Sequence, residues 1–370
     1  MYIGNNMTKK KKIGILTLRV DNNYGGHLQR YALSRVLQEM GHDACVLYFR
    51  STWNNDSTKK RLKKAVKNII KKLLGKTAGH ILYWKHEELS WQETRKNAFP
   101  FFQRYISHSE LIYSLQSLKR HVCKANYDVL IVGSDQVWRK AYTERWGVDR
   151  FFLDFAPESS KKIAYAASFG GFDMEYNEDE LQHLQRLYGR LDAVSVREEL
   201  GLAILEKHGW KIPKAVHVLD PTMLLPKEHY LQLINNGNTK SSNGNMFCYI
   251  LDNNDNAKLV VNKLKNEKGY IPYFASIDGE NRMSVEQWLR SFVDADYIVT
   301  DSYHGVVFSL IFNKPFYLIS NEGRGNARFE SLKQTFNLQE NSEEYNVELV
   351  NEKILSLREK SYIFLRNALK

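Results

Sequence analysis

The sequence predicts an α/β protein built from two halves, each with a parallel sheet. Short apolar segments alternate with helix-period segments along most of the chain, as in βαβ units. A length of 370 residues suits two domains better than one. A proline-containing break after the strand-like VHVLDP segment separates the two alternating runs. Two such halves place a cleft between them.

The first half opens with a βαβ unit. Ile13–Leu18 alternates as a strand, His27–Met40 carries apolar residues at helical spacing, and Ala44–Phe49 is a second strand. Gly41 is typical of a helix C-terminal cap. Further strand-and-turn units follow at residues 127–138, 161–170, 193–198 and 216–221. We therefore expect one parallel sheet in this half.

The second half repeats the alternation. Its expected strands lie near residues 246–252, 270–276, 297–302 and 315–320. Its expected helices centre on residues 256–266, 285–293, 306–312 and 329–336. We predict an N-terminal Rossmann-like domain at 12–220 with a basic helical insert at about 51–123, and a C-terminal Rossmann-like domain at 221–346. A last helix at 347–370 is a candidate to pack back on the N-terminal domain.

Composition excludes several classes of protein. Cys45, Cys123 and Cys248 are scattered, which argues against a disulfide framework or a zinc site and favours a reducing, cytoplasmic location. No apolar segment has the length of an export signal or a membrane span. Asp294 and Asp296 form a DxD pattern, but it ends a helix before a strand, on the wrong side of the sheet. We therefore expect no metal and no cofactor.

The net charge of +11 is concentrated in two stretches. Lys9–Lys12 and Lys59–Lys76 hold four and nine cations, which leaves the rest of the chain slightly acidic. The second stretch has an apolar and a cationic helix face, a pattern typical of binding to an anionic membrane surface. Packing of the apolar face on the protein body remains an equal alternative. Nucleic acid is not expected, because aromatic residues for base stacking are missing.

Residues just after strands are the candidates for chemistry, because ligands of open α/β sheets bind at the carboxyl ends of the strands. His304 lies after a strand and at the start of an apolar helix, next to Ser302, where an imidazole suits anion binding or proton transfer. The alternative is a capping turn. Arg197 ends the strand AVSV and suits a carboxylate or phosphate, or else a salt bridge with Glu198 or Glu199.

Weaker candidates follow other strands of both halves. Each has an ordinary structural alternative: a flexible βα turn, a helix cap or a solvated loop charge. They are Asn23, Gly25 and Gly26 after the first strand, Ser134, Asp135 and Ser168 after later strands of the first half, and Arg324 and Arg328 after the last strand.

Several ordered motifs together resemble the polysaccharide pyruvyl transferase family. They are IGILTLRVDNNYGGHLQRYALSRVLQEMGH, YDVLIVGSDQVW, AYAASFG, SVRE, LDPTMLL and TDSYHGVVFSLIFNKPF. The resemblance runs from about Lys12 to Leu338 and covers the insert poorly. It implies a GT-B-like fold, phosphoenolpyruvate as the donor and a sugar hydroxyl pair as the acceptor, which a membrane lipid could carry.

The resemblance also implies residue roles. In the family, the residues that match Arg197 and His304 hold the donor. As our own hypothesis for the reaction, Arg197 would fix the carboxylate and His304 would contact the phosphate and donate or relay a proton. Asp135 or Asp301 would accept a hydroxyl proton. Some members carry an arginine where this chain has Ser302, so Arg324 or Arg328 would compensate. The alternatives are a GT-B glycosyltransferase that uses a nucleotide sugar, and a non-catalytic, membrane-associated binding protein.

Overall fold

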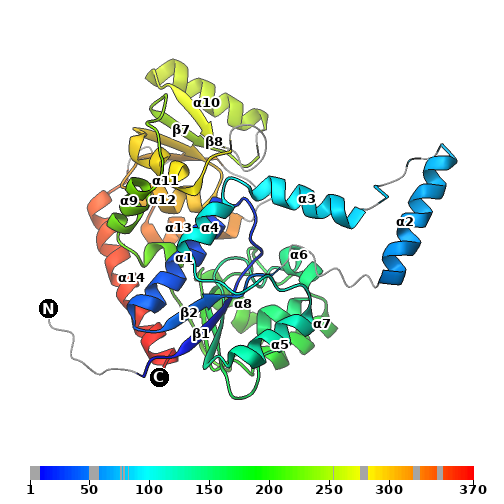
Figure 1. Ribbon diagram of the computed structural model, residues 1–370. Helices are drawn as coiled ribbons and strands as arrows, with labels where there is room; N and C mark the ends of the chain where they lie inside the picture. Colours follow the sequence, from blue (N-terminus) through cyan, green and yellow to red (C-terminus); the bar gives the residue numbers. More distant parts are fainter. Residues whose placement is uncertain are drawn as a thin grey trace.

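Two parallel sheets form the centre of the fold (Figure 1). The computed structural model describes residues 9–49, 58–75, 77, 80–81, 83–252, 254–275, 282–319, 326–339 and 345–370. The first sheet has the order β2-β1-β3-β4-β5-β6 and the second the order β10-β9-β7-β8. All of their strand pairs are parallel. The predicted α/β fold class, with two halves that each hold a parallel sheet, is confirmed.

The central strands are apolar because helices cover both faces of each sheet. β3 (VLIV) and β7 (MFCY) are buried along their whole length. The strands of the first sheet are β1 Lys12–Leu16, β2 Asp43–Val46, β3 Val129–Val132, β4 Lys161–Ala167, β5 Ala193–Val196 and β6 Ala215–His217. Those of the second are β7 Met246–Tyr249, β8 Pro272–Ala275, β9 Tyr297–Thr300 and β10 Phe316–Leu318.

The helices differ in detail from the sequence expectations. α1 begins three residues earlier than predicted, because the Asn23 side chain caps its first turn. The helices up to the end of the first sheet are α1 Tyr24–Glu39, α2 Thr58–Leu73, α3 Tyr83–Arg95, α4 Phe99–Tyr105, α5 Leu115–Ala125, α6 Lys140–Thr143, α7 Glu178–Tyr188 and α8 Leu200–Lys207. Those that follow are α9 Lys227–Asn236, α10 Asp255–Lys268, α11 Val285–Asp294, α12 Tyr303–Ile311, α13 Asn326–Phe336 and α14 Val347–Ala368.

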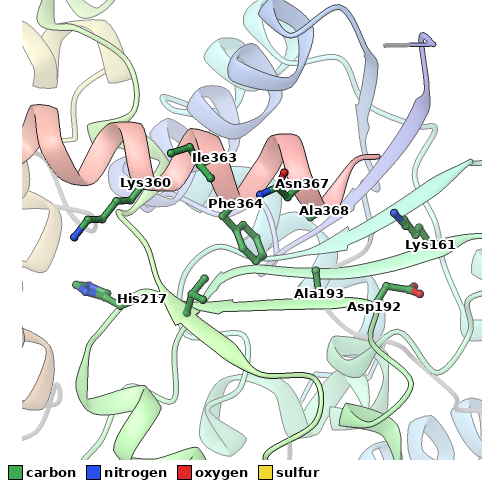
Figure 2. Close-up of a pocket in the computed structure, with 10 residues that line it drawn as sticks. Lys161, Asp192, Ala193, His217, Lys360, Ile363, Phe364, Asn367 and Ala368 are labelled. Atoms are coloured by element: carbon green, nitrogen blue, oxygen red, sulfur yellow. The ribbon is translucent and has the colours of Figure 1, made fainter. Parts of the chain in front are cut away.

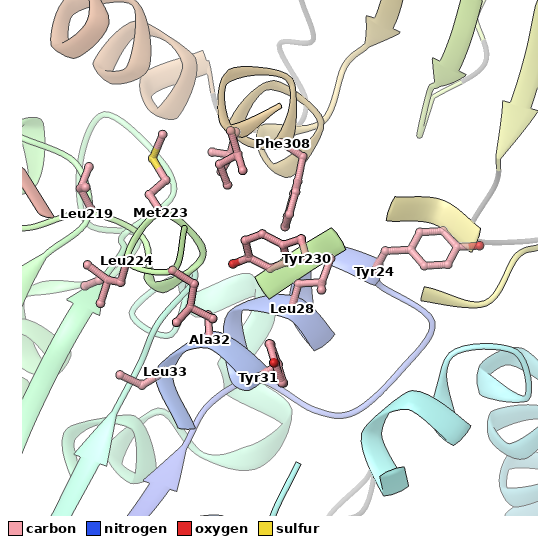
Figure 3. Packing of buried hydrophobic residues seen from close by; sticks show 14 of the residues in the cluster. Tyr24, Leu28, Tyr31, Ala32, Leu33, Leu219, Met223, Leu224, Tyr230 and Phe308 are labelled. Atoms are coloured by element: carbon pink, nitrogen blue, oxygen red, sulfur yellow. The ribbon is translucent and has the colours of Figure 1, made fainter. Parts of the chain in front are cut away.

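One hydrophobic cluster joins the two halves (Figure 3). α1 contributes Tyr24 and Leu28, while α12 contributes Phe308, and all three are almost fully buried. Tyr24 stacks on Trp288 of α11 with ring centroids 5.5 Å apart. The segment that begins at Pro221 is a short 3₁₀ helix, Pro221–Met223, and belongs to this cluster rather than to an exposed linker.

The last helix, α14, crosses from the second half to the first (Figure 1). Its Ser361 hydroxyl accepts a hydrogen bond from the Leu219 amide at 3.0 Å, and Arg358 donates to the Met223 carbonyl at 2.9 Å. Tyr345, just before the helix, donates to the Lys314 carbonyl. α14 therefore ties the two halves together along its length.

The helix α2, which is part of the basic insert, stands away from both sheets (Figure 1). Most of its described apolar side chains are exposed, so it is not packed on the body by its apolar face. Within the described parts of the chain, no helix is long and apolar enough to cross a bilayer.

Candidate functional site

The carboxyl ends of strands from both sheets meet at one cluster of charged side chains. Arg197 directly follows β5, Asp220 comes shortly after β6, and Asp135 comes after β3. His304 lies in the first turn of α12, which follows β9 of the other sheet. Its Nε2 is 3.6 Å from Oδ2 of Asp220, so this contact joins the halves. The cluster thus occupies the edge where open α/β sheets bind ligands.

The Arg197 side chain is the centre of this cluster and is fully buried. Its Nε donates to Oε1 of Glu198 at 2.8 Å, and its Nη1 donates to Asp220 at 3.1 Å and to Asp135 at 3.3 Å. Burial alone would lower the pKa of Arg197, but the surrounding acidic groups raise it well above its usual value. The guanidinium is therefore a permanent, firmly held cation.

The two aspartates of the cluster are ionised. Burial alone would raise the pKa of the Asp135 carboxyl, but Arg197, His304 and Arg328 hold it below its usual range. Burial is likewise outweighed at Asp220, whose pKa is lowered by His304 and then by Arg197. Either carboxylate can therefore accept a proton only in a step that changes the positive charges around it.

The His304 ring lies directly against α1. A Cβ atom added to Gly25 would come within 2.2 Å of the Cγ and Nδ1 atoms of this ring, so only glycine fits there. The Asn23 side chain accepts from the Gly26 amide at 3.1 Å and caps the same turn. Two helix N-termini, those of α1 and α12, therefore meet at His304, where their dipoles favour a negative charge.

An aromatic ring separates the two arginines of the site. The Arg197 guanidinium lies 4.2 Å from the centroid of the Tyr303 ring, and that of Arg328, from α13, lies 5.7 Å from it. Tyr303 is buried, so these cation–π contacts operate in a dry environment. The pKa of Arg328 is lowered by burial and by the nearby charge of Arg197. The second arginine is thus held near a like charge, an arrangement that an added anion would relieve.

A small cavity and an open hydrogen-bond donor mark where a ligand atom fits. Nη2 of Arg197 is buried and has no hydrogen-bond partner among the described residues. Arg197, Asp220, Tyr303 and Arg328 line a cavity of about 10 Å³, the space of one water molecule. Such a buried cationic N–H group calls for an acceptor. An oxygen atom of an anion meets that need.

A larger hollow lies elsewhere (Figure 2). It measures about 570 Å³ and lies between α14 and β4, β5 and β6, with Lys161, Asp192 and Phe364 in its wall. Neither Arg197 nor His304 lines it. Lys161 and Asp192 belong to the amino ends of the strands, whereas His217 lines both this groove and the small cavity beside Arg197.

The structure brings four of the predicted site residues together: Asp135, Arg197, His304 and Arg328. Gly25 joins them through its contact with His304. Ser302 precedes α12 and is buried nearby, where its amide donates to the Thr300 hydroxyl. These residues come from both halves of the chain and from five separate strand or helix ends.

Other predicted residues make internal contacts instead. Asn23 serves as the cap of α1, with the Gly26 amide as its donor. The Ser134 hydroxyl donates to the Ala166 carbonyl, and the Ser168 hydroxyl accepts from the Gly170 amide. Arg324 lies outside the described residues.

The proposed alternative proton acceptor is also engaged. The Asp301 carboxylate accepts from the amides of Leu251 and Asp252 at 2.7 and 2.9 Å. It therefore holds the loop after β7 in place. Asp135 is the one of the two candidates that lies in the charged cluster.

Sequence reasoning missed three members of the cluster as functional residues. Asp220 falls in the strand-and-turn unit predicted at 216–221 but is not among the predicted site residues, although an aspartate after a strand and before a proline is a usable signal. Glu198 was considered only as a partner of Arg197, and in fact it is that partner. Tyr303 gave no signal, because an aromatic residue at a helix start is ordinarily part of a core.

The chain matches one protein family over most of its length. The family model for polysaccharide pyruvyl transferases matches residues 23–323 of the chain, a range that holds Arg197, Asp220 and His304. The chain belongs to the polysaccharide pyruvyl transferase family. It is therefore a member of a transferase family concerned with polysaccharides, as the ordered motifs predicted. No curated protein matches this pyruvyl transferase family member.

Solved structures with a similar course of the chain include nucleotide-sugar enzymes. A UDP-GlcNAc 2-epimerase from Methanocaldococcus jannaschii has a TM-score of 0.47 at 12% identity and covers 94% of this chain and 99% of its own. A UDP-N-acetylglucosamine 2-epimerase from Rickettsia bellii has a TM-score of 0.48 at 9% identity, covering 97% of both chains. An α-glucosyltransferase in complex with UDP has a TM-score of 0.42 at 10% identity and covers 95% of this chain and 96% of its own.

Proposed function

We propose that this protein transfers the enolpyruvyl group of phosphoenolpyruvate onto two hydroxyl groups of a sugar, which gives a pyruvate ketal and phosphate. The observation that carries the proposal is the buried Arg197 with its open Nη2 donor, which shares Asp220 with His304 of the other half, in a chain of the polysaccharide pyruvyl transferase family. Phosphoenolpyruvate has a carboxylate and a phosphate, and this site has separate donors for two anionic groups.

The charges of the site suggest how the donor is divided between its residues. Asp135, Glu198 and Asp220 already balance the arginines, so the site has no large excess of cations. Among the described residues, the donors left for the substrate include Nη2 of Arg197 and the first-turn amide groups of α12, a helix with no side-chain cap. We assign the carboxylate to Arg197 through Nη2 and the phosphate to the two helix N-termini beside His304.

The transfer proceeds in two additions. A proton added to the methylene carbon of the donor turns it into a methyl group and leaves an oxocarbenium-like centre at C2. One sugar hydroxyl attacks C2 and loses its proton, and the bond from C2 to the phosphate oxygen then breaks. The second hydroxyl attacks the same carbon, its proton leaves, and the ketal ring closes. The two hydroxyl groups release two protons in all, and the new methyl group has gained one. One proton therefore remains, and it goes to the phosphate or to solvent.

His304 and the neighbouring carboxylates are placed to move these protons. We assign the donation to the methylene carbon to His304, whose ring is oriented by Asp220 at 3.6 Å and by the backbone of Gly25. Asp135 is the proposed acceptor of a hydroxyl proton. Preorganised charges and helix dipoles of this kind stabilise charge that develops in the transition state.

The donor is tested by thermal unfolding. Millimolar phosphoenolpyruvate should raise the melting temperature, and a ligand at about a hundred times its Kd contributes roughly 2.7 kcal/mol. Phosphate release in the presence of lipid-linked or nucleotide-linked sugars, with mass spectrometry of the product, then identifies the acceptor. If a nucleoside diphosphate raises the melting temperature and phosphoenolpyruvate does not, the proposal is overturned in favour of a glycosyltransferase. No response to either would favour a binding protein.

We also propose that the reaction takes place in the cytoplasm. The support is that Cys45, Cys123 and Cys248 are all free thiols, and Cys123 is exposed, which suits a reducing compartment.

A further inference from the structure

The helix α2 presents a continuous apolar row to solvent. Leu62, Val66, Ile69 and Leu73 recur at spacings of four, three and four residues, which places them on one side of the helix. Their exposed fractions are 63, 48, 39 and 81%, so the row is not covered by the body of the protein. Ile70 and Leu74 are exposed as well. Apolar side chains in such a row are costly to leave in water unless something covers them.

The opposite side of α2 is cationic. Lys63, Lys64, Lys67 and Lys71 are exposed, and the helix from Thr58 to Leu73 contains no acidic residue. The helix has 16 residues, which corresponds to a length of about 24 Å. Whatever covers the apolar row must therefore also tolerate or attract a dense positive charge over that length.

The segment that follows α2 is anchored to the body of the protein. α3 follows α2 in the chain, and its Trp91 donates to the Val20 carbonyl at 3.0 Å, in the loop that leads into α1. Arg95 lies between the rings of Trp91 and Phe99, at 3.6 and 3.7 Å from their centroids. Arg282 of the second half donates to the Glu93 carbonyl. The helix α2 is thus carried by a segment that is anchored to both halves, close to where α1 begins.

We propose that α2 is a membrane-docking helix that lies in the interface of an anionic lipid surface. The apolar row would enter the boundary of the acyl chains while the lysines contact anionic headgroups, the arrangement of interfacial amphipathic helices. This inference goes beyond the proposed function, because docking needs neither donor nor acceptor. It would bring the site beside α1 to an acceptor carried on a lipid.

Two other occupants fit the charges less well. A second copy of α2 that paired apolar rows would bring two sets of lysines close together, and like charges repel. Nucleic acid would satisfy the lysines, but it would leave the apolar row exposed, and α2 has no aromatic residue for base stacking. Of these three occupants, the anionic lipid surface is the one that uses both sides of the helix.

Flotation of the full-length protein with vesicles tests the proposal. The protein should float with vesicles of phosphatidylcholine and phosphatidylglycerol at about 0.1 M salt, and binding should weaken strongly at about 1 M salt, where screening shortens the range of charge interactions. Vesicles of phosphatidylcholine alone should bind it poorly. Failure of the wild-type protein to float under any of these conditions overturns the proposal.

A pair of charge-matched variants locates the surface. Changing Lys63, Lys64, Lys67 and Lys71 to glutamate should reduce partitioning by about a hundredfold or more, because each cation near an anionic leaflet contributes to binding. The control changes four exposed lysines of α10 to glutamate: Lys258, Lys263, Lys265 and Lys268. It alters the net charge equally and should float nearly as well as the wild type. Equal loss in both variants would overturn the assignment to α2.

A third variant tests the apolar row. Leu62→Ser with Leu73→Ser leaves every lysine in place and should also weaken flotation, while the melting temperature stays unchanged because both side chains are exposed. Normal flotation of this variant would show a purely electrostatic contact and overturn the interfacial geometry. Binding of an oligonucleotide that competes with vesicles, or self-association lost with Leu73→Ser in the absence of lipid, would replace the lipid with one of the other occupants.

Discussion

The position of His304 depends on the absence of a side chain at Gly25. A Cβ atom at this position would lie 2.2 Å from the imidazole, so Gly25→Ala must displace the ring or the start of α1. Overpacking of this kind costs about 1–3 kcal/mol of stability. We expect turnover to fall by about a hundredfold, since small misplacements of catalytic groups have effects of that size. Steady-state kinetics and a crystal structure of the variant would measure both effects.

The control for this variant is Gly189→Ala. A Cβ atom there would keep 3.6 Å from its nearest neighbours, and Gly189 lies at the end of α7, outside the site. It should leave turnover unchanged. Full activity in Gly25→Ala would show that the His304 ring is not held by this contact, and the assigned proton donation would lose its basis.

Asp220 makes the stability of the folded protein at low pH depend on the charged cluster. Its pKa is lowered in the folded protein, so its ionised form stabilises the fold at neutral pH, and this contribution is lost as pH falls below about 4. Asp220→Asn should be less stable than the wild type at pH 7. The difference in the free energy of unfolding should then narrow below pH 4 by up to about 1.4 kcal/mol per pH unit. Urea unfolding of both proteins across this range measures it.

A constant difference between the two proteins at all pH values would contradict this account. It would mean that the carboxylate has an ordinary pKa and that the asparagine acts by its shape. Asp192→Asn is a useful comparison, because its carboxylate accepts from the Lys162 amide at the other end of the strands, away from Arg197.

The sequence could predict single residues only where a strand end made them stand out. Arg197 directly follows an apolar strand and His304 lies shortly after another, and the structure places both in one cluster. Asp220 comes after a strand of only three residues, and the proline that follows it indicates a break between the halves rather than a site. Which strand ends meet is a property of the packing between the halves, and no local pattern contains it.

At the scale of elements, the strands were easier to predict than the starts of the helices. Buried parallel strands such as β3 are continuous apolar runs, which the periodicity detects. The starts of α1 and α12 depend on capping and on close contacts: Asn23 caps one, and Gly305 packs its backbone against Thr300 at the other. The sequence also could not show whether the apolar row of α2 is buried or exposed, because that depends on whether the body offers a matching surface.

The end of α11 bears on the need for a metal. Asp294 closes this helix, pairs with Arg290 at 2.6 Å and accepts from the Ser242 amide, while Asp296 accepts from Asn245. Both precede β9, whose opposite end leads to His304. We expect the activity with phosphoenolpyruvate to survive a chelator, because arginine and helix dipoles would carry the charge stabilisation. A strict requirement for a divalent ion that Asp294→Ala abolishes would contradict this expectation.

At the scale of the whole molecule, the site exists only while the two halves are packed together. The Tyr24 hydroxyl of α1 accepts from the Met283 amide at 2.8 Å, and α14 bonds to the segment between the sheets. His304 and Asp220 approach each other across the same junction. Catalytic geometry and stability between the halves therefore depend on the same contacts.

The packing of both halves around one hydrophobic cluster predicts one cooperative unfolding transition. The cluster that contains Leu28, Tyr230 and Phe308 draws on both halves, so neither half keeps a complete core when the other unfolds (Figure 3). Leu28→Ala removes a fully buried side chain of α1 and should cost about 2–5 kcal/mol. Calorimetry should show a single transition in both proteins, shifted to lower temperature in the variant. The exposed Leu355→Ala should shift it little. Two separate transitions, of which Leu28→Ala moves only one, would show that the halves are independent domains and that the shared cluster does not couple them.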